Sequence, residues 1–253
     1  MSSRKPEAAP DKISVNLAID AGNTRVKWGV FTGDRLTHHG EWTNWTVSDF
    51  IDLSTNQSVQ KVILSSVRGD LPELSEYFQR HFTFLTLESN TPLPIRNCYA
   101  TPETLGRDRI AAAAGAYALF PGRNCLVVDA GTCTTYEVIT AGGDYLGGNI
   151  SPGIDMRLKA MHHFTARLPL VNTGETAAWI GDSTETALQN GAQWGAILET
   201  EGYIRTLRRQ MGTLTTILTG GNADFLAKKL KNRIFVHPYL VLIGLNKILA
   251  YNV

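Results

Sequence analysis

The sequence has almost no net charge and no long hydrophobic run, and each absence excludes a class of protein. Its 253 residues carry 24 Lys and Arg against 23 Asp and Glu, a formal net charge of +1, and no basic stripe stands out. We therefore expect no nucleic-acid-binding surface. No window approaches the roughly 18 apolar residues that a membrane-spanning helix needs, so we expect no membrane span.

Cysteine is also scarce. The three cysteines, Cys98, Cys125 and Cys133, form no C-x-x-C pair and have no metal-site spacing. An odd number of scattered cysteines is typical of reduced thiols, which favours a cytoplasmic protein. Residues 1–12 are polar, contain proline and lack the apolar core of a signal peptide. We expect them to form a flexible tail.

A turn of small residues between two predicted strands is the first candidate site. An apolar run ends at Asp20, and residues 21–24 lead into a second strand near 26–31. Such a turn directs successive backbone N–H groups toward one point, which is how a loop holds phosphate. Asp20 would meet a metal ion or its water, because a carboxylate and a phosphate repel each other. An ordinary hairpin is the structural alternative.

The same pattern recurs in the second half of the chain. Asp129-Ala-Gly-Thr132 follows an apolar strand and precedes another β-rich run, which indicates an internal duplication. A third turn, Thr219-Gly-Gly-Asn222, follows an apolar run and precedes a helical pattern. Two phosphate turns that face each other across a cleft, with a Gly-Gly turn for the nucleoside, would make an ATP site.

The predicted elements repeat in order as well. Three consecutive strands begin each half, at 15–19, 26–31 and 35–41 and at 125–129, 134–140 and 144–150; further strands are expected at 61–65, 82–87, 215–219 and 234–237, and helices near 46–53, 70–80, 154–162, 183–210, 223–230 and 239–250. This order predicts an α/β fold of two similar lobes with a cleft between them. We assign 13–118 to the N-terminal lobe with its connecting helix and 119–253 to the C-terminal lobe.

The connection between the lobes carries Gly106-Arg-Asp-Arg109, which begins an Ala-rich helix. Asp108 in a first helical turn is favoured by the helix dipole, so capping is the structural alternative, with Arg107 and Arg109 as solvated charges. In the functional alternative, Asp108 accepts a hydroxyl proton while Arg109 holds an anionic substrate through its two-point fork. The spacing alone leaves both open.

Five motifs together resemble the type III pantothenate kinases, which belong to the acetate kinase, sugar kinase, Hsp70 and actin superfamily. In the family's order they are Asp20-Ala-Gly-Asn-Thr-Arg-Val-Lys27, Gly106-Arg-Asp-Arg109, Asp129-Ala-Gly-Thr132, Gly147-Gly-Asn-Ile-Ser-Pro-Gly153 and Gly181-Asp-Ser-Thr184. The resemblance runs from about residue 13 to the end. It implies phosphorylation of pantothenate by ATP, the first step of coenzyme A synthesis. It also implies duplicated RNase H-like lobes of the actin-like ATPase kind, and a homodimer.

The resemblance also implies a role for each matching residue. ATP would be bound by Asp20, Ala21, Gly22, Asn23, Thr24, Arg25, Val26, Lys27, Thr132, Gly220 and Gly221, with Asp20 near Mg²⁺. The pantothenate site would comprise Tyr99, Gly106, Arg107, Asp108, Arg109 and Thr184. Within it, Asp108 accepts the proton, Arg109 faces the carboxylate and Thr184 comes from the partner subunit. Arg107 fills the motif's variable position and receives no catalytic role. Asp129 would bind an activating K⁺ or NH₄⁺. Cys133 stands where a small apolar residue is more usual.

Two other functions stay open: a kinase of this fold for another small hydroxy compound, and a non-catalytic ATP-binding accessory or regulatory protein. Asp20 and Asp129 are rival general bases, but cations would occupy their lone pairs in the phosphate turns. His162 and His163 are adjacent, so they point apart on a helix and cannot form an i, i+4 metal pair.

Overall fold

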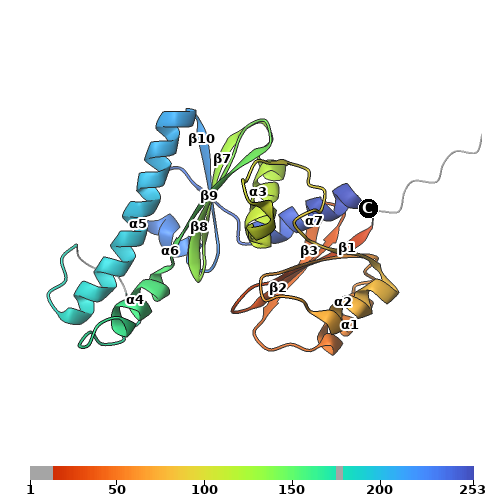
Figure 1. Ribbon diagram of the computed structural model, residues 1–253, viewed down its shortest axis with the longest axis horizontal. Helices are drawn as coiled ribbons and strands as arrows, with labels where there is room; N and C mark the ends of the chain where they lie inside the picture. Colours follow the sequence, from red (N-terminus) through yellow and green to blue (C-terminus); the bar gives the residue numbers. More distant parts are fainter. Residues whose placement is uncertain (1–13, 175–178) are drawn as a thin grey trace, which may run out of the picture.

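Two mixed β-sheets, one from each half of the chain, form the framework of the molecule (Figure 1). The structure, a computed structural model, describes residues 14–174 and 179–253. The predicted tail, residues 1–12, lies outside the described residues. Within the part that is described, no helix is both long and apolar enough to cross a membrane.

The first sheet has the strand order β3-β2-β1-β4-β5. Its strands are β1 (Val15–Ala21), β2 (Val26–Thr32), β3 (Arg35–Trp42), β4 (Lys61–Ser66) and β5 (Thr83–Thr86), and its helices are α1 (Val47–Asn56) and α2 (Pro72–His81). The central strand β1 pairs antiparallel with β2 and parallel with β4. It reads as a continuous apolar run because helices cover both of its faces.

The second sheet repeats this topology. Its order is β11-β10-β7-β8-β9-β6, so β9-β8-β7-β10-β11 corresponds to the whole first sheet and β6 is an added edge strand. The strands are β6 (Arg96–Asn97), β7 (Asn124–Ala130), β8 (Cys133–Ile139), β9 (Asp144–Pro152), β10 (Leu214–Thr219) and β11 (Phe235–Val236), with helices α4 (Ile154–His163), α5 (Thr184–Met211) and α6 (Ala223–Lys229). The predicted duplication of the lobes is confirmed. The two-residue strand β6 has no sequence signal and was not predicted.

Two crossing helices lie between the sheets (Figure 1). The Ala-rich helix α3 (Arg107–Leu119), which follows the short 3₁₀ turn η1 (Pro102–Thr104), packs against β7 and β8, whereas the last helix, α7 (Leu240–Asn252), packs against β1 and β4. The helices touch at Gly115 and Gly244, where a Cβ atom would overlap the backbone carbonyls of Leu240 and Ala111. The end of the chain thus returns to the first sheet. The boundary at 118/119 stays a prediction.

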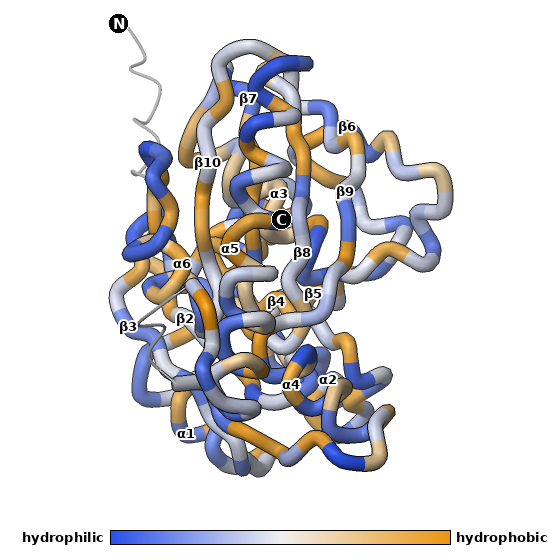
Figure 2. The backbone as a smooth tube through the Cα atoms, turned by 90° about the vertical axis from the view of Figure 1, so that its left-hand side faces the viewer, coloured by the Kyte–Doolittle hydropathy of each residue, from blue (hydrophilic) through white to orange (hydrophobic). Residues whose placement is uncertain are grey.

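Apolar side chains fill the space on both faces of each sheet. Strand β10 is buried along its whole length, and Figure 2 shows part of it in the orange of hydrophobic residues. A buried polar contact secures the returning helix, because Asn16 Nδ2 of β1 donates to Asn246 Oδ1 of α7 at 2.9 Å. A buried frame therefore holds the carboxyl ends of β1 and β7, and both predicted phosphate turns follow those ends.

Candidate active site

The two small-residue turns face each other across the gap between the sheets. Thr24 Oγ1 lies 3.4 Å from Thr132 Oγ1, although the residues are 108 positions apart. Each turn is closed by a backbone bond: Gly22 N–H donates to the Arg25 carbonyl at 3.0 Å, and Gly131 N–H to the Cys133 carbonyl at 2.9 Å. Because the turns occupy equivalent places in the two sheets, the duplication produces a two-sided site.

Three aspartates converge beside these turns. Asp20 is 8% exposed and accepts a hydrogen bond from Ser65 Oγ at 3.5 Å. Burial, reinforced by the charges of Asp108 and Asp129, raises the pKa of Asp20 to about 7, while Lys27 opposes the rise. Burial likewise raises the pKa of Asp129 to about 6, against Lys27 and with a contribution from Asp108. The carboxylates therefore interact electrostatically, and their combined negative charge favours a bound cation.

Asp108 lies in the first turn of α3, half-buried, where its Oδ1 accepts the N–H of Arg109 at 2.9 Å. Burial raises the pKa of Asp108, and the nearby charge of Glu137 adds to the effect. The local hydrogen bond matches the capping interpretation, and the coupling to Asp20 and Asp129 matches the functional one. The two interpretations are compatible, because the local bond uses only one carboxylate oxygen, and the role of Asp108 as proton acceptor stays a prediction.

Arg109 already holds a carboxylate of the protein. Its Nε donates to Glu137 Oε1 at 2.7 Å and its Nη2 to Glu137 Oε2 at 2.9 Å. Arg109 is 6% exposed and Glu137 is fully buried. The guanidinium carbon lies 5.5 Å from the centre of the Tyr99 ring. The sequence predicted a fork that faces substrate, whereas two of its five N–H groups are engaged within the chain.

The other predicted ATP-site residues fall in two groups. The Gly220–Gly221 turn lies beside the second phosphate turn, because Thr219 pairs with Asp129 and Asn222 N–H donates to the Ala130 carbonyl at 2.9 Å. Arg25, in contrast, forms an ion pair with Glu41.

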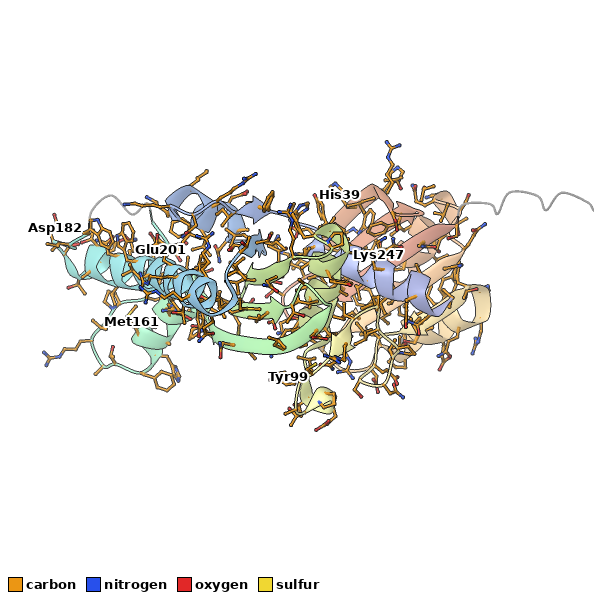
Figure 3. All side chains as sticks on the ribbon, turned by 90° about the horizontal axis from the view of Figure 1, so that it is seen from above. His39, Tyr99, Met161, Asp182, Glu201 and Lys247 are labelled. Atoms are coloured by element: carbon orange, nitrogen blue, oxygen red, sulfur yellow. The ribbon has the colours of Figure 1, made fainter. Side chains whose placement is uncertain are left out.

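Two predicted substrate residues are not drawn into the cluster. Arg107 Nε donates to the Leu87 carbonyl at 3.0 Å, which is a structural contact and agrees with its lack of a catalytic role. Thr184 is exposed at the start of α5. Figure 3 labels its neighbour Asp182 at one end of the molecule, far from Tyr99. No hydrogen bond among the described residues joins Thr184 to Asp20, Asp108 or Asp129.

Sequence reasoning missed several polar residues at the site. Arg68 donates to the backbone carbonyl of Gly22 and, through Nη2, to that of Asn23 at 3.0 Å, so it supports the first turn from outside. Ser65 and Glu137 contact Asp20 and Arg109. The position of Glu137 inside the apolar predicted strand 134–140 could have indicated a buried, functional carboxylate. The partners of Arg68, in contrast, depend on the tertiary fold and could not be predicted from the sequence.

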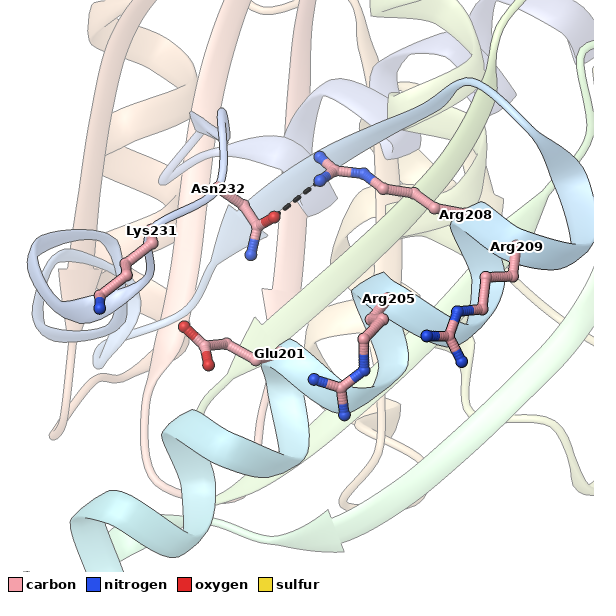
Figure 4. Close-up of a pocket in the computed structure, with 6 residues that line it drawn as sticks. All are labelled: Glu201, Arg205, Arg208, Arg209, Lys231 and Asn232. Atoms are coloured by element: carbon pink, nitrogen blue, oxygen red, sulfur yellow. Dashed lines mark hydrogen bonds between the residues drawn. The ribbon is translucent and has the colours of Figure 1, made fainter.

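A second concave region lies elsewhere. Its volume is about 520 Å³, and Figure 4 shows it between the C-terminal half of α5 and the segment after α6. The lining residues are Glu201, Arg205, Arg208, Arg209, Lys231 and Asn232, and Arg208 Nη1 donates to Asn232 Oδ1 at 2.6 Å. None of the predicted site residues lines it. The converging carboxylates, not this hollow, mark the candidate site.

Comparison with known proteins agrees with this geometry. A family model described as Type III pantothenate kinase matches residues 16–206. The chain is 42% identical to a type III pantothenate kinase of Christiangramia forsetii over 243 residues, which cover 94% of this chain and 99% of the relative.

Solved structures share the fold. A Baf family protein of Campylobacter jejuni superposes with a TM-score of 0.61 at 26% identity, covering 93% of this chain and 98% of the other. An inorganic polyphosphate/ATP-glucomannokinase of Arthrobacter gives a TM-score of 0.51 at 12% identity over 94% and 99% of the two chains, which shows the fold alone. The expected architecture of duplicated actin-like lobes is thus confirmed. By sequence match over most of its length, the chain belongs to the type III pantothenate kinase family.

Proposed function

We propose that this protein transfers the γ-phosphoryl group of ATP to the primary hydroxyl of pantothenate, the first step of coenzyme A biosynthesis. One observation carries the proposal: Asp20, Asp108 and Asp129, from three separate segments, lie beside two turns that meet at Thr24 and Thr132, where the charge of Asp108 raises the pKa of both other aspartates. Buried carboxylates with raised pKa values at the junction of two lobes are typical of a functional site. Family membership specifies the substrates.

Phosphoryl transfer needs mainly positioning and charge neutralisation. Backbone N–H groups of the two turns would bind the phosphates, Lys27 would add positive charge, and Gly220 and Gly221 would lie along the nucleoside. Asp108 would accept the hydroxyl proton, which contributes about 10²–10⁴-fold to such reactions. Its raised pKa makes it a stronger base than an ordinary aspartate. Tyr99, Gly106 and Arg109 would hold the acceptor.

The carboxylates fit the cations that such a reaction uses. Asp20 would hold Mg²⁺ and Asp129 would hold K⁺ or NH₄⁺, and these ions would neutralise charge on the phosphates. Oxygen donors whose pKa values are raised by burial and by neighbouring carboxylates suit hard cations. Among the described residues, no three His, Cys, Asp or Glu form a complete metal cage. That agrees with ions that share their ligands with phosphate and water.

We further propose a homodimer in which Thr184 of each subunit completes the partner's pantothenate site. The start of α5, near the labelled Asp182, lies toward the far end of the molecule from Tyr99, which favours a contribution of Thr184 to the site of a second subunit (Figure 3). Large apolar side chains are exposed in that region: Phe164 by 81%, Trp179 by 64%, Ile180 by 84% and Leu198 by 50%. Gly191, with open space around its Cα, would let a partner helix approach. A second copy of the chain would cover this surface.

Complementation tests the shared site. Homodimers of Asp108→Asn and of Thr184→Arg should each be nearly inactive. After subunit exchange, a mixed dimer has one doubly altered and one intact site. Random exchange makes about half of the dimers mixed, so activity should return to about a quarter of wild type. If mass spectrometry confirms exchange and activity stays absent, Thr184 serves its own chain.

Product identification tests the substrate. The purified chain, ATP, Mg²⁺ and K⁺ are incubated with pantothenate or with a hexose, and the products are analysed by mass spectrometry. Only pantothenate should gain a phosphate. Phosphorylation of the hexose alone would favour a kinase for another hydroxy compound. ATP binding with no phosphorylated product would favour the accessory protein. A cytoplasmic location is also proposed, supported by three free thiols.

A further inference from the structure

A fully buried glutamate lies directly behind the proposed substrate arginine. Glu137, in the middle of β8, has no exposed surface and receives three hydrogen bonds. Two come from Arg109, at 2.7 and 2.9 Å, and the third from the hydroxyl of Tyr145, at 2.6 Å. A buried carboxylate is tolerated only with such partners. The three donors fix the position of the carboxylate, and the carboxylate in turn fixes the guanidinium.

The neighbouring strand leaves room for this arrangement. Glu137 pairs with Gly148 of β9, and a Cβ atom at Gly148 would lie 2.9 Å from Glu137 Oε2 and overlap the Tyr136 carbonyl. The ring of Tyr99 stacks on that of Tyr145, with centroids 6.3 Å apart, and lies under Arg109. Tyr99, Arg109, Glu137 and Tyr145 thus form one connected unit, and the backbone N–H of Arg109 donates to Asp108 at the start of α3.

We infer that Glu137 is a positioning residue that sets the specificity of the site for a carboxylate-bearing acceptor. It binds the Nε/Nη2 edge of Arg109, so the remaining N–H groups, on Nη1 and Nη2, are turned toward Tyr99 and the substrate carboxylate. This inference rests on the proposed function. Glu137 touches no substrate itself. It acts through Arg109, and Tyr145 holds it in place.

A second consequence concerns Asp108, the residue next to Arg109 in sequence. The charge of Arg109 lowers the pKa of Asp108, whereas burial and the charge of Glu137 raise it. Without Glu137, Arg109 would be a buried cation beside Asp108 that lacks its fixed carboxylate partner. Glu137 therefore orients the substrate-binding cation and offsets its positive charge next to the proposed base.

The alternative is a buried ion pair that only stabilises the fold. Substrate comparison separates the two. The probe is pantothenol, in which CH₂OH replaces the carboxylate of pantothenate. It is measured as a slow substrate or as a competitive inhibitor. A fold defect weakens both ligands, whereas a misplaced Arg109 weakens only the ligand that carries a carboxylate.

We would compare Glu137→Gln with wild type in the full chain, with melting curves for each. The KM for pantothenate should rise about tenfold or more, because a charge-assisted fork is lost. The KM for ATP and the affinity for pantothenol should stay within about twofold. Glu137→Asp, which keeps the charge, should recover part of the pantothenate KM. The control is Asp144→Asn, which removes a carboxylate from another Arg pair of this sheet, Arg96–Asp144 at 2.7 Å, and should leave all three values unchanged.

An unchanged or lower pantothenate KM in Glu137→Gln, or an equal loss of pantothenate and pantothenol, overturns the inference. If Glu137→Gln does not fold, the variant to use is Tyr145→Phe, which removes only the hydroxyl that donates to Glu137. It should raise the KM for pantothenate several-fold. An unchanged KM for pantothenate in Tyr145→Phe also overturns the inference. These failures differ from failure of the proposed function. In that case, wild type itself would not phosphorylate pantothenate.

Discussion

The crossing of α3 and α7 gives a prediction whose size follows from the coordinates. In Gly244→Ala, the new methyl group would overlap the Ala111 carbonyl and lie 2.9 Å from Gly115 N, whereas ordinary contacts begin at 3.4 Å. Backbone atoms cannot rotate away, so the helices must separate along their whole contact. Overpacking of this kind costs about 1–3 kcal/mol and occasionally more, and Ala returns about 1 kcal/mol of helix propensity.

We take the upper end of that range, because the neighbours are backbone atoms of two helices that join the lobes. The cost of about 3 kcal/mol, less the helix-propensity gain of about 1 kcal/mol, leaves a net loss of about 2 kcal/mol, which would lower the melting temperature by about 4–8 °C in a chain of this size. The matched control is Gly202→Ala on α5, where nothing lies within 4 Å of the added atom. It should be stabilised by about 1 kcal/mol. Circular dichroism melting of both variants measures the difference. A Gly244→Ala protein that melts at or above the wild-type temperature would refute the packing argument.

The site itself makes two more predictions. The pKa of Asp20 rises from 3.8 in the unfolded chain to about 7 in the folded protein. Its stabilising contribution is therefore complete below pH about 4 and is lost as the pH rises through about 7. In EDTA without nucleotide, Asp20→Asn should raise the melting temperature more at pH 8 than at pH 5. The control is Asp52→Asn, at an exposed position of α1, which should show no such difference. Equal effects of Asp20→Asn at the two pH values would contradict this. Replacing K⁺ by Na⁺ should lower the rate of wild type but not that of Asp129→Ala, and equal wild-type rates in the two salts at matched ionic strength would exclude the cation site.

Most of the fold could be predicted from local patterns. The apolar runs before Asp20 and Asp129 are buried central strands, and the repeated order of elements is a repeated sheet topology. The Ala-rich run after Gly106 is α3. These features are local, since a strand covered on both faces and a strongly helix-forming segment each produce a recognisable sequence pattern within about ten residues.

The contacts of the site were harder to predict, because they join residues far apart in the chain. Nothing near Arg109 indicates that Glu137, 28 residues later, occupies its fork. Arg68 reaches a turn 45 residues earlier. The return of α7 to the first sheet likewise depends on the packing of Gly244 against α3 and has no local signal.

The most direct test of the account is pantothenate-dependent ADP release by the purified chain with Mg²⁺ and K⁺, in wild type and in Asp108→Asn. The account predicts that wild type releases ADP only when pantothenate is present. Asp108→Asn keeps the side-chain shape but cannot accept a proton, so its kcat should fall by about 10²-fold or more while its KM for ATP stays within a few-fold. A wild-type rate that does not depend on pantothenate, or a variant that turns over like wild type, would contradict the account.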